Sequence, residues 1–413
     1  MFGRGTALVS LLILALNPFH LWYAQEAASY ALAVFLGLLS SYYCYSYFLL
    51  TKDKKDLWCY LLLAALALYS NYFCAILLIC LQFFVFLFSR ERFRKKISVS
   101  LPFLTFLPWV PFFVTKVSLL KGSFWIPAPS LQSLGITVEN FMLGYNGTRL
   151  LYQTAGILAL ALLLMVWRRL FQKPPEQKQL YFCLTLFFLP IFLSFALSKL
   201  FFSIYLDRGF LIFSPYFYML LSWAILKIKP RALKQATATM LCILFLTGDA
   251  LYFLNQMYMP NNMRHHTGAF LKKPFKPLVK FINKNLQEEN DYVVLSYSAP
   301  LFPLIHYAKR SVKEINTFAF YAYDPDLRDT NLAKPFREIF KNCDRFFPID
   351  TALATIKTNN GKVFFIGGTF QRDGRLDKNS RSVKDAFDKN LILMQDLDFD
   401  GLRLFIYKIP ENR

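Results

Sequence analysis

The stretch from Leu57 to Phe88, LWCYLLLAALALYSNYFCAILLICLQFFVFLF, decides the fold of this chain. As one helix, this stretch would extend about 48 Å at 1.5 Å per residue, well beyond a hydrocarbon core of about 30 Å. The polar residues Ser70 and Asn71 lie near its middle, and basic clusters flank it at residues 52–55 and 90–96. We therefore expect a hairpin of two membrane-spanning helices, with both ends of the hairpin in the cytoplasm.

The composition of the whole chain is also that of a membrane protein. Of its 413 residues, 55% are hydrophobic and 45 are Phe, far more than an ordinary soluble domain contains. The formal net charge is +21, but the Lys and Arg residues occur in short clusters between apolar runs. A nucleic-acid partner is therefore not expected, because nucleic-acid-binding proteins gather their basic residues on one face. The expected surroundings are a membrane.

Seven further apolar runs are long enough to cross a bilayer, which takes about 20 residues. Together with the hairpin they predict nine spans and a membrane body at residues 1–256. The expected fold class is thus an α-helical polytopic membrane protein of about nine spans with a C-terminal soluble α/β domain at residues 257–413. The seven runs lie near residues 5–21, 28–50, 98–116, 149–167, 179–201, 208–228 and 236–256.

The C-terminal domain is distinguished by evenly spread charges and by alternating strand-like and helix-like segments. Gly367-Gly368 follows one expected strand but falls far short of the glycine fingerprint of a dinucleotide site. Cys343 is the only cysteine of this domain, so we expect it to be a free thiol. The expected strands lie at residues 292–296, 363–367, 391–395 and 402–408, and the expected helices at 276–287, 300–308 and 382–390.

The distribution of basic residues between the loops predicts the orientation. Up to residue 256, one set of loops carries 17 Lys and Arg residues and the other carries 5. Short cytoplasmic loops hold the excess of Lys and Arg, so the N-terminus is expected in the cytoplasm. Nine crossings of the cell (inner) membrane then place the C-terminal domain on the extracytoplasmic side. A signal peptide is the alternative for the first run, although Asn17-Pro18 follows where a cleavage site would stand.

The segment from Asn17 to Tyr30, NPFHLWYAQEAASY, is the first candidate site. Glu26 stands at the turn into the next helix, and an ionisable group at membrane depth is usually retained for a ligand or a pathway. The plain alternative is an aromatic girdle at the membrane surface, with His20 in the girdle and a Glu that favours a helix start. The pair His265-His266 has no third ligand at metal-site spacing, so no metal site is expected there.

The same segment resembles the S-P-F-H-x-x-Y-S-Q-E-A-R-x-Y-A-L signature of bacterial membrane glycosyltransferases of the C-fold type. These are dolichyl-phosphate-mannose-protein mannosyltransferase-like enzymes that use polyprenyl-phosphate-linked sugars. The resemblance extends over essentially the whole membrane body and is specific for the superfamily rather than for a substrate. Three further segments resemble family motifs in the same order: Tyr69–Phe73 (Y-T-H-Y-F), Leu101–Pro111 (L-P-W-x-P) and Asp207–Pro215 (x-R-Y-L-x-x-x-x-P).

The resemblance implies transfer of a sugar from a polyprenyl-phosphate donor to a glycan, lipid or protein acceptor on the extracytoplasmic side. Arg208 is the first candidate for the donor phosphate, because a guanidinium matches phosphate geometry in a bidentate manner. Lys199 is the second candidate. A salt bridge to Asp207 or simple extension toward the membrane surface is the plain alternative for Arg208. Residues expected to line the substrate cavity are Gln25, Glu26, Tyr69, Asn71 and Asp207.

The chain departs from the family pattern in its catalytic part. Ala28 stands where the signature has Arg, and Asn71 stands where the hairpin has His. Family members begin with two extra spans and carry their catalytic acidic pair in the loop between those spans, which corresponds to a region upstream of Met1. The catalytic residues are therefore unknown, with Glu26 a candidate accessory residue. The chain as given is expected to bind donor lipid but to transfer little sugar. No cofactor is identified, and a divalent metal is left open.

Two other functional classes stay open. A transporter or flippase of lipid-linked sugars is disfavoured by the odd number of expected spans, the lack of an inverted repeat and the few charges inside the spans. A catalytically inactive membrane scaffold is the other alternative, because the acidic pair of the family has no counterpart in the sequence given.

Overall fold

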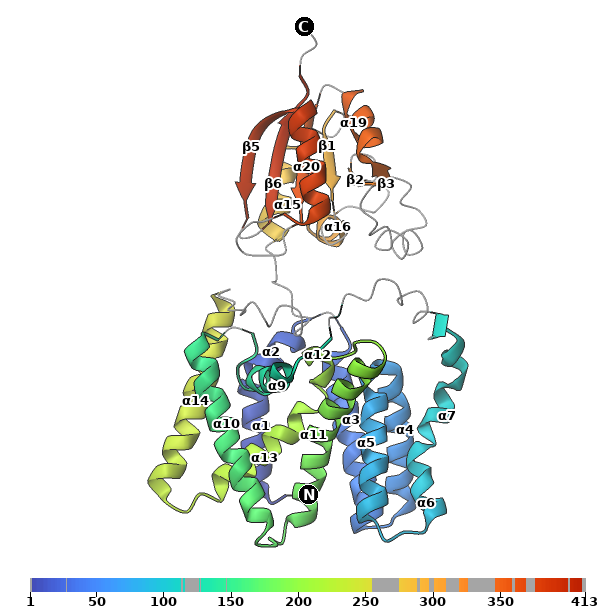
Figure 1. Ribbon diagram of the computed structural model, residues 1–413, viewed down its shortest axis with the longest axis vertical. Helices are drawn as coiled ribbons and strands as arrows, with labels where there is room; N and C mark the ends of the chain where they lie inside the picture. The colour runs from blue at the N-terminus through green and yellow to red at the C-terminus, as the bar shows by residue number, and fades with distance from the viewer. Residues whose placement is uncertain are drawn as a thin grey trace. The chain divides into compact units, whose positions relative to one another are not determined.

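The computed structural model describes residues 2–26, 28–112, 114–115, 126, 128–145, 147–254, 275–287, 290–296, 301–309, 319–325, 346–358, 361–368, 376–399 and 402–410. The chain forms two compact units, Met1–Phe270 and Leu271–Arg413. In its described residues the first, which we call the membrane unit, consists of helices. The second, which we call the C-terminal unit, is built on a β-sheet (Figure 1).

The helices of the membrane unit differ widely in length. Short segments alternate with long ones, and a π-helical turn, Ser46–Leu50, continues α3. The elements are α1 (Arg4–Leu16), α2 (Pro18–Ala24), α3 (Tyr30–Tyr45), α4 (Lys54–Ser70), α5 (Phe73–Phe88), α6 (Phe93–Ile97), α7 (Pro102–Phe106), α9 (Leu131–Leu143), α10 (Arg149–Leu170), α11 (Gln177–Leu200), α12 (Asp207–Phe210), α13 (Ser214–Leu226) and α14 (Arg231–Phe253).

Four helices of the described chain are long and apolar enough to cross a membrane, which supports the multi-span helical class. They are α3 with its π-helical continuation, α10, α11 and α14. The pair α1 and α2 gives a fifth if it is counted as one span, although its axis bends by 61°. Helices α5 and α13 are apolar but shorter. The nine spans expected from the sequence are therefore not confirmed.

The run from Leu57 to Phe88 is broken into two helices, α4 and α5, as its length predicted. The break falls at Asn71, whose Oδ1 accepts the backbone N–H of Phe73 at 2.9 Å and so caps the second helix. The expected span at 98–116 is not one helix but a series of short helical segments. Pro102, Pro108 and Pro111 lack the N–H that a continuous helix requires, which explains the breaks.

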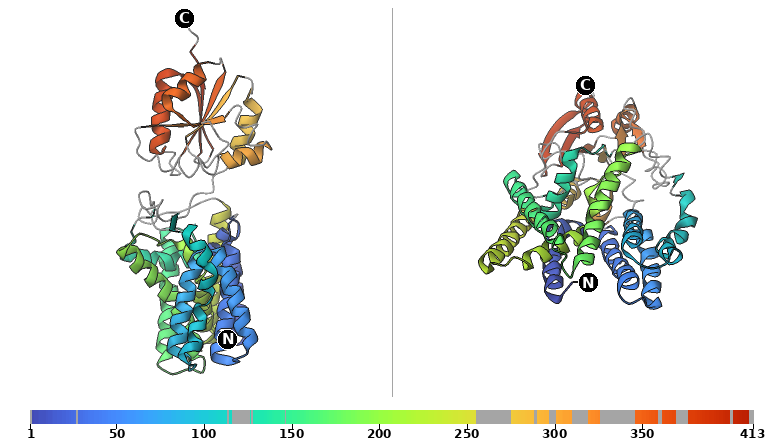
Figure 2. Two further views of the ribbon diagram at one scale, coloured as in Figure 1. Left: turned by 90° about the vertical axis from the view of Figure 1, so that its right-hand side faces the viewer. Right: turned by 60° about the horizontal axis from the view of Figure 1, so that its bottom comes forward.

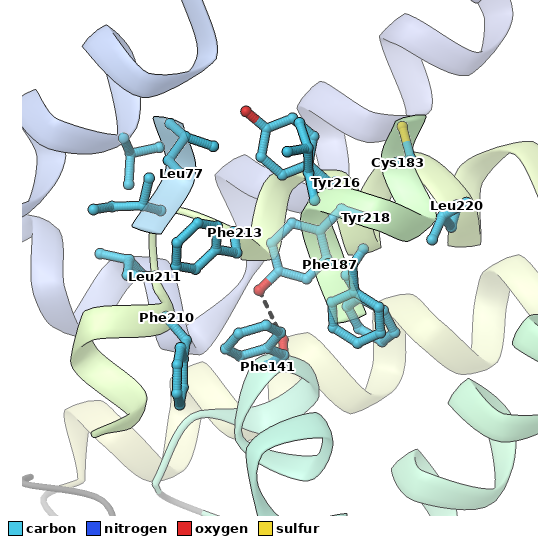
Figure 3. Packing of buried hydrophobic residues seen from close by; sticks show 14 of the residues in the cluster. Leu77, Phe141, Cys183, Phe187, Phe210, Leu211, Phe213, Tyr216, Tyr218 and Leu220 are labelled. Carbon is cyan, nitrogen blue, oxygen red and sulfur yellow. Dashed lines mark hydrogen bonds between the residues drawn. The ribbon is translucent and has the colours of Figure 1, made fainter. Parts of the chain in front are cut away.

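Helix α13 occupies the centre of the membrane unit. Eleven of its 13 residues are buried. Neighbouring helices thus surround it, which explains why it is apolar on all sides. It packs against α1, α10 and α11. Figure 3 shows aromatic rings from separate helices meeting around it, where the Tyr218 hydroxyl donates to the Phe141 carbonyl at 2.8 Å. This bond fixes α9 against the central helix.

The C-terminal unit is a six-stranded mixed sheet in the order β3-β2-β1-β4-β6-β5. Strand β1 pairs in parallel with β2 and β4, β2 pairs in parallel with β3, and β6 is antiparallel to both β4 and β5. The strands are β1 (Tyr292–Leu295), β2 (Ala319–Tyr323), β3 (Phe346–Pro348), β4 (Lys362–Gly367), β5 (Ile392–Asp398) and β6 (Arg403–Lys408).

Helices cover both faces of this sheet (Figure 2). Helices α15 (Phe275–Asn285) and α16 (Leu301–Ala308) pack on one face, and α19 (Ile349–Lys357) and α20 (Lys378–Asn390) pack on the other. The four strands and three helices expected from the sequence have counterparts here, with ends shifted by a few residues. Strands β2 and β3 and helix α19 were not predicted. The thiol prediction for Cys343 and the linker interpretation of His265-His266 lie outside the described residues.

Candidate functional site

Three of the segments singled out in the sequence, Asn17–Tyr30, Tyr69–Phe73 and Asp207–Pro215, meet at one end of the membrane unit, which we call the α2/α9/α12 end (Figure 1). The Ser29 hydroxyl donates to the Ser70 carbonyl at 2.5 Å, which joins the first motif to the α4–α5 turn. Phe73, just after that turn, packs under Gly209, where a Cβ would come within 2.4 Å of the ring. The first, second and fourth motifs are thus direct neighbours, although about 180 residues of sequence separate their outer members.

Asn17 creates the bend between α1 and α2. Its Oδ1 accepts the backbone N–H groups of Phe19 and His20 at 3.0 and 3.3 Å, and Pro18 occupies the first turn of α2. This is the geometry of a helix N-cap followed by proline. Asn17 Nδ2 donates to the Phe141 carbonyl at 2.9 Å. One buried side chain therefore starts a helix and attaches it to α9.

Asp207 lies at the centre of a buried polar cluster and is fully inaccessible to solvent. The Thr137 hydroxyl donates to Asp207 Oδ1 at 2.7 Å, and Asn140 Nδ2 donates to Oδ2 at 2.6 Å. The Tyr205 hydroxyl lies 2.8 Å from that of Thr137, so it completes the chain of hydroxyl groups. Both oxygens of the carboxyl are thus bound by α9.

Arg208 follows Asp207 in α12 and is half-buried. It lies close enough to Tyr23 and Tyr30 to interact electrostatically with both hydroxyl groups. The Tyr23 hydroxyl is itself hydrogen-bonded to that of Tyr145 at 2.6 Å. The guanidinium therefore lies within electrostatic range of two tyrosines of the first motif.

Gln25 and Glu26 are held by aromatic side chains. The Trp22 indole N–H donates to Glu26 Oε1 at 3.0 Å, and the Tyr252 hydroxyl donates to Gln25 Oε1 at 2.6 Å. Glu26 also lies within electrostatic range of Tyr23 and Tyr30. These two residues therefore share the α2/α9/α12 end with Arg208.

Tyr69 and Asn71 lie at the turn between α4 and α5 and have local partners. The Tyr69 hydroxyl donates to the Thr105 carbonyl at 2.5 Å, and Asn71 caps α5. Lys199 lies elsewhere, exposed in the last turn of α11, with its ammonium 5.9 Å from the centre of the Phe195 ring. The structure thus places Tyr69 and Asn71 next to the first motif but shows no contact between Lys199 and the other candidate residues.

His20 contacts side chains of α13 in addition to its neighbours in the aromatic segment. Its Nε2 lies 2.6 Å from Ser214 Oγ, and its ring meets that of Tyr218 edge-on at 5.5 Å. Ser214 is completely buried, so its hydroxyl is not accessible as a nucleophile. The pair links α2 to the start of α13.

Two carboxyl groups near this end did not stand out in the sequence. Glu139, in α9, lies against α10, with Oε1 3.7 Å from the point where a Cβ on Gly156 would stand. Asp249, in α14, follows Gly248, which packs against Pro18. Asp249 Oδ1 is buried without a hydrogen bond to the described residues, and no partner of Glu139 occurs among them. An acidic residue within an apolar helix is the signal that would have identified both.

No metal centre is found in the described part of the chain, where no three His, Cys, Asp or Glu side chains come together. An apolar groove of about 560 Å³ lies between α10 and α14. It faces outward from the helix bundle and is lined by Thr154, Gln235, Ala236, Thr239, Met240, Ile243 and Leu244. Its lining is suited to a hydrocarbon chain rather than to a polar ligand.

Ligands of open α/β sheets usually bind in the crevice at the point where the strand order reverses. In the sheet of the C-terminal unit that point lies between β1 and β4. The start of α20 lies beside it. Asn379 Nδ2 donates to the Ser296 carbonyl at 2.7 Å, and the Gly368 N–H donates to Ser380 Oγ at 2.8 Å. These bonds attach the start of α20 to the ends of β1 and β4.

No protein-family model matches the chain, and no curated protein matches it.

Proposed function

We propose that the membrane unit binds a polyprenyl-phosphate-linked sugar at the α2/α9/α12 end and transfers the sugar to a glycan, lipid or protein acceptor. The observation that carries the proposal is the convergence of three motif-like segments, Asn17–Tyr30, Tyr69–Phe73 and Asp207–Pro215, which are remote in sequence. A site for one lipid-phosphate donor needs such convergence, because phosphate, sugar and acceptor must be held at once.

In this proposal Arg208 binds the donor phosphate, and Asp207 holds α12 against α9 so that Arg208 points toward the first motif. Asp207 is a poor candidate for the proton acceptor, because both its oxygens are already bound within the protein. A general base needs an oxygen that reaches the acceptor hydroxyl. Glu139 and Asp249 are better candidates, because both residues are only partly buried and no hydrogen bond to the described residues occupies Glu139 or Asp249 Oδ1.

The proposal includes an orientation in the cell (inner) membrane. The N-terminus, α6 and the loops rich in Lys and Arg lie at the end of the membrane unit opposite to α2, α9 and α12 (Figure 1). Two contacts support this grouping: Gly5 lies beside Leu226, and Lys227 forms an ion pair with Glu176 at 3.1 Å. Basic loops face the cytoplasm, so we propose nine crossings with the α2/α9/α12 end and the C-terminal domain outside.

The experiment is donor binding and sugar transfer by the purified protein in lipid nanodiscs, with a panel of radiolabelled polyprenyl-phosphate sugars. We expect at least one donor to bind saturably, with binding reduced in Arg208→Ala and unchanged in Arg168→Ala, which removes one arginine at the opposite end. If transfer is detected, Glu139→Gln and Asp249→Asn are expected to lower its rate by roughly 10² to 10⁴-fold where the residue is the base.

The same assay distinguishes the alternatives. Movement of intact donor lipid between the two leaflets, without transfer, would favour a transporter or flippase of lipid-linked sugars. Failure of the folded wild-type protein to bind any donor in the panel would contradict the proposal and leave the scaffold as the remaining class.

A further inference from the structure

Two neighbouring loops carry a dense positive charge at the end of the membrane unit opposite to α2, α9 and α12 (Figure 1). Residues 51–56 and 89–97 contain eight basic and three acidic side chains, an excess of five positive charges. We call the eight basic residues the basic patch: Lys52, Lys54, Lys55, Arg90, Arg92, Arg94, Lys95 and Lys96.

One acidic side chain joins the two loops. Glu91 Oε1 lies 3.0 Å from Lys52 Nζ, and Glu91 Oε2 lies 3.2 Å from Lys95 Nζ. The Glu91 side chain is only 12% exposed, so its charge is already used by these two lysines. Arg90, Arg92 and Arg94 are exposed and make no ion pair with any described residue. Their charges therefore face outward.

Exposed aromatic rings accompany the arginines. Phe93 lies between Arg92 and Arg94, is 66% exposed, and packs on Phe86 with 5.6 Å between ring centres. Trp58, in the first turns of α4, is 70% exposed. Large apolar rings beside basic side chains at the ends of membrane helices match the headgroup layer, where a charge meets phosphate and a ring meets the upper acyl chains. Unpaired bases of a nucleic acid could also stack on such rings, but rings at the ends of apolar helices lie where the headgroups of a bilayer are adjacent.

We propose that the basic patch binds the phosphate groups of anionic phospholipids, with Phe93 and Trp58 inserted between the headgroups. The partner is a lipid of the surrounding bilayer rather than a free anion, because the rings gain only from an apolar layer. This surface is remote from the α2/α9/α12 end, so the inference is independent of the proposed sugar transfer.

The test is the lipid preference of the full-length protein in phosphatidylcholine vesicles, measured by electron spin resonance with spin-labelled phosphatidylglycerol or phosphatidylcholine. We expect phosphatidylglycerol to be enriched about fivefold beside the wild-type protein, the factor that corresponds to attraction of one basic residue to an anionic surface. The variant R90Q/R92Q/R94Q should show almost no enrichment, a factor of about one. The lysines that remain in the basic patch are partly neutralised by Glu91 and the two aspartates.

The matched control is K229Q/R231Q/K234Q, which removes three positive charges from the start of α14, a stretch of the unit that contains no aromatic residue. This stretch therefore has positive charge, like the basic patch, but no rings to enter the headgroup layer. The control should keep the preference of the wild-type protein. Soluble glycerol phosphate at constant ionic strength should not displace the labelled lipid.

Three outcomes would overturn the proposal. One is equal labelling by the two lipids beside the wild-type protein, and another is an equal loss in the two triple variants, which would show a diffuse effect of net charge. The third is tight binding of RNA or an acidic protein to the patch in vesicles that give no phosphatidylglycerol preference. Unchanged thermal unfolding of both variants in detergent shows that the comparison is between folded proteins.

Discussion

Asn140 Nδ2 donates a 2.6 Å hydrogen bond to Asp207 Oδ2 in the interior of the membrane unit, across 67 positions of sequence. Both residues are completely buried. The bond fixes α12, and with it Arg208, against α9. The arrangement makes Asp207 a positioning residue, and its consequences are measurable without knowledge of the substrate.

We expect Thr137→Ala to destabilise the membrane unit by about 1.5 to 3 kcal/mol, because it removes a hydrogen bond to a buried carboxyl group. Thr154→Ala is the matched control. Both threonine hydroxyls lie within hydrogen-bond distance of the carbonyl four residues earlier, but only that of Thr137 reaches Asp207. Thr154, half-buried at the α10–α14 groove and without a carboxylate partner among the described residues, should change stability by no more than about 0.5 kcal/mol. Thermal unfolding in detergent measures both, and equal effects would show that the Asp207 contact is unimportant.

We expect Gly209→Ala to destabilise the same unit by about 1 to 3 kcal/mol through overpacking, since its Cβ would lie 2.2 to 2.4 Å from three carbons of the Phe73 ring. Gly135→Ala, at an exposed position of α9 with nothing within 4 Å of a Cβ, should instead stabilise by about 0.5 to 1 kcal/mol.

In the double variant Gly209→Ala/Phe73→Leu, Leu replaces the ring that the new methyl group would meet. This variant should recover part of the unfolding temperature that Gly209→Ala loses. A double variant that is as unstable as the sum of its single changes would place the strain elsewhere.

The ion pairs of Glu91 should give a small pH dependence of stability. Lys52 and Lys95 hold the pKa of Glu91 below its ordinary value of 4.5. A lowered pKa stabilises the folded state above the ordinary value, and this contribution disappears as the pH falls through the folded-state pKa. The free energy of unfolding of the wild-type protein should therefore exceed that of Glu91→Gln by at most about 1 kcal/mol at neutral pH. The unfolding temperatures of wild type and Glu91→Gln should converge as the pH is lowered from neutral to acidic. A difference between them that grows on acidification would contradict a stabilising role of the ion pairs.

Arg208→Ala is expected to weaken binding of polyprenyl phosphate by about tenfold or more, the factor for losing a hydrogen bond to a charged group. Arg208→Lys should fall between wild type and the Ala variant, because it keeps the charge but loses the bidentate geometry. Lys199→Ala should have a smaller effect, since Lys199 is exposed beside Phe195. Titration of the nanodisc-embedded protein measures all three, and a larger loss in Lys199→Ala would reverse the assignment of the phosphate contact.

The sequence alone determined the class of the fold. Apolar runs such as Leu57–Phe88 can be buried only in a bilayer or a helix bundle, and this requirement is local to each run. The length of that run also predicted its division at Asn71. In the C-terminal unit, short runs of apolar residues, many of them β-branched or aromatic, located β1, β4, β5 and β6, and burial in β1, β4 and β6 is nearly continuous. Strands β2 and β3 were missed, and β3, with three residues, is too short to show a pattern.

Which polar groups are free could be decided only by the tertiary structure. Asp207 and Glu26 looked like candidate carboxylates in sequence, but their hydrogen-bond partners, Asn140 and Trp22, are set by packing between helices and within a turn. The position of Glu139 against α10 is likewise set by packing between helices. The physical reason is general: hydropathy and charge patterns follow the chain, whereas the bonding of a buried polar group depends on residues brought to it by the fold.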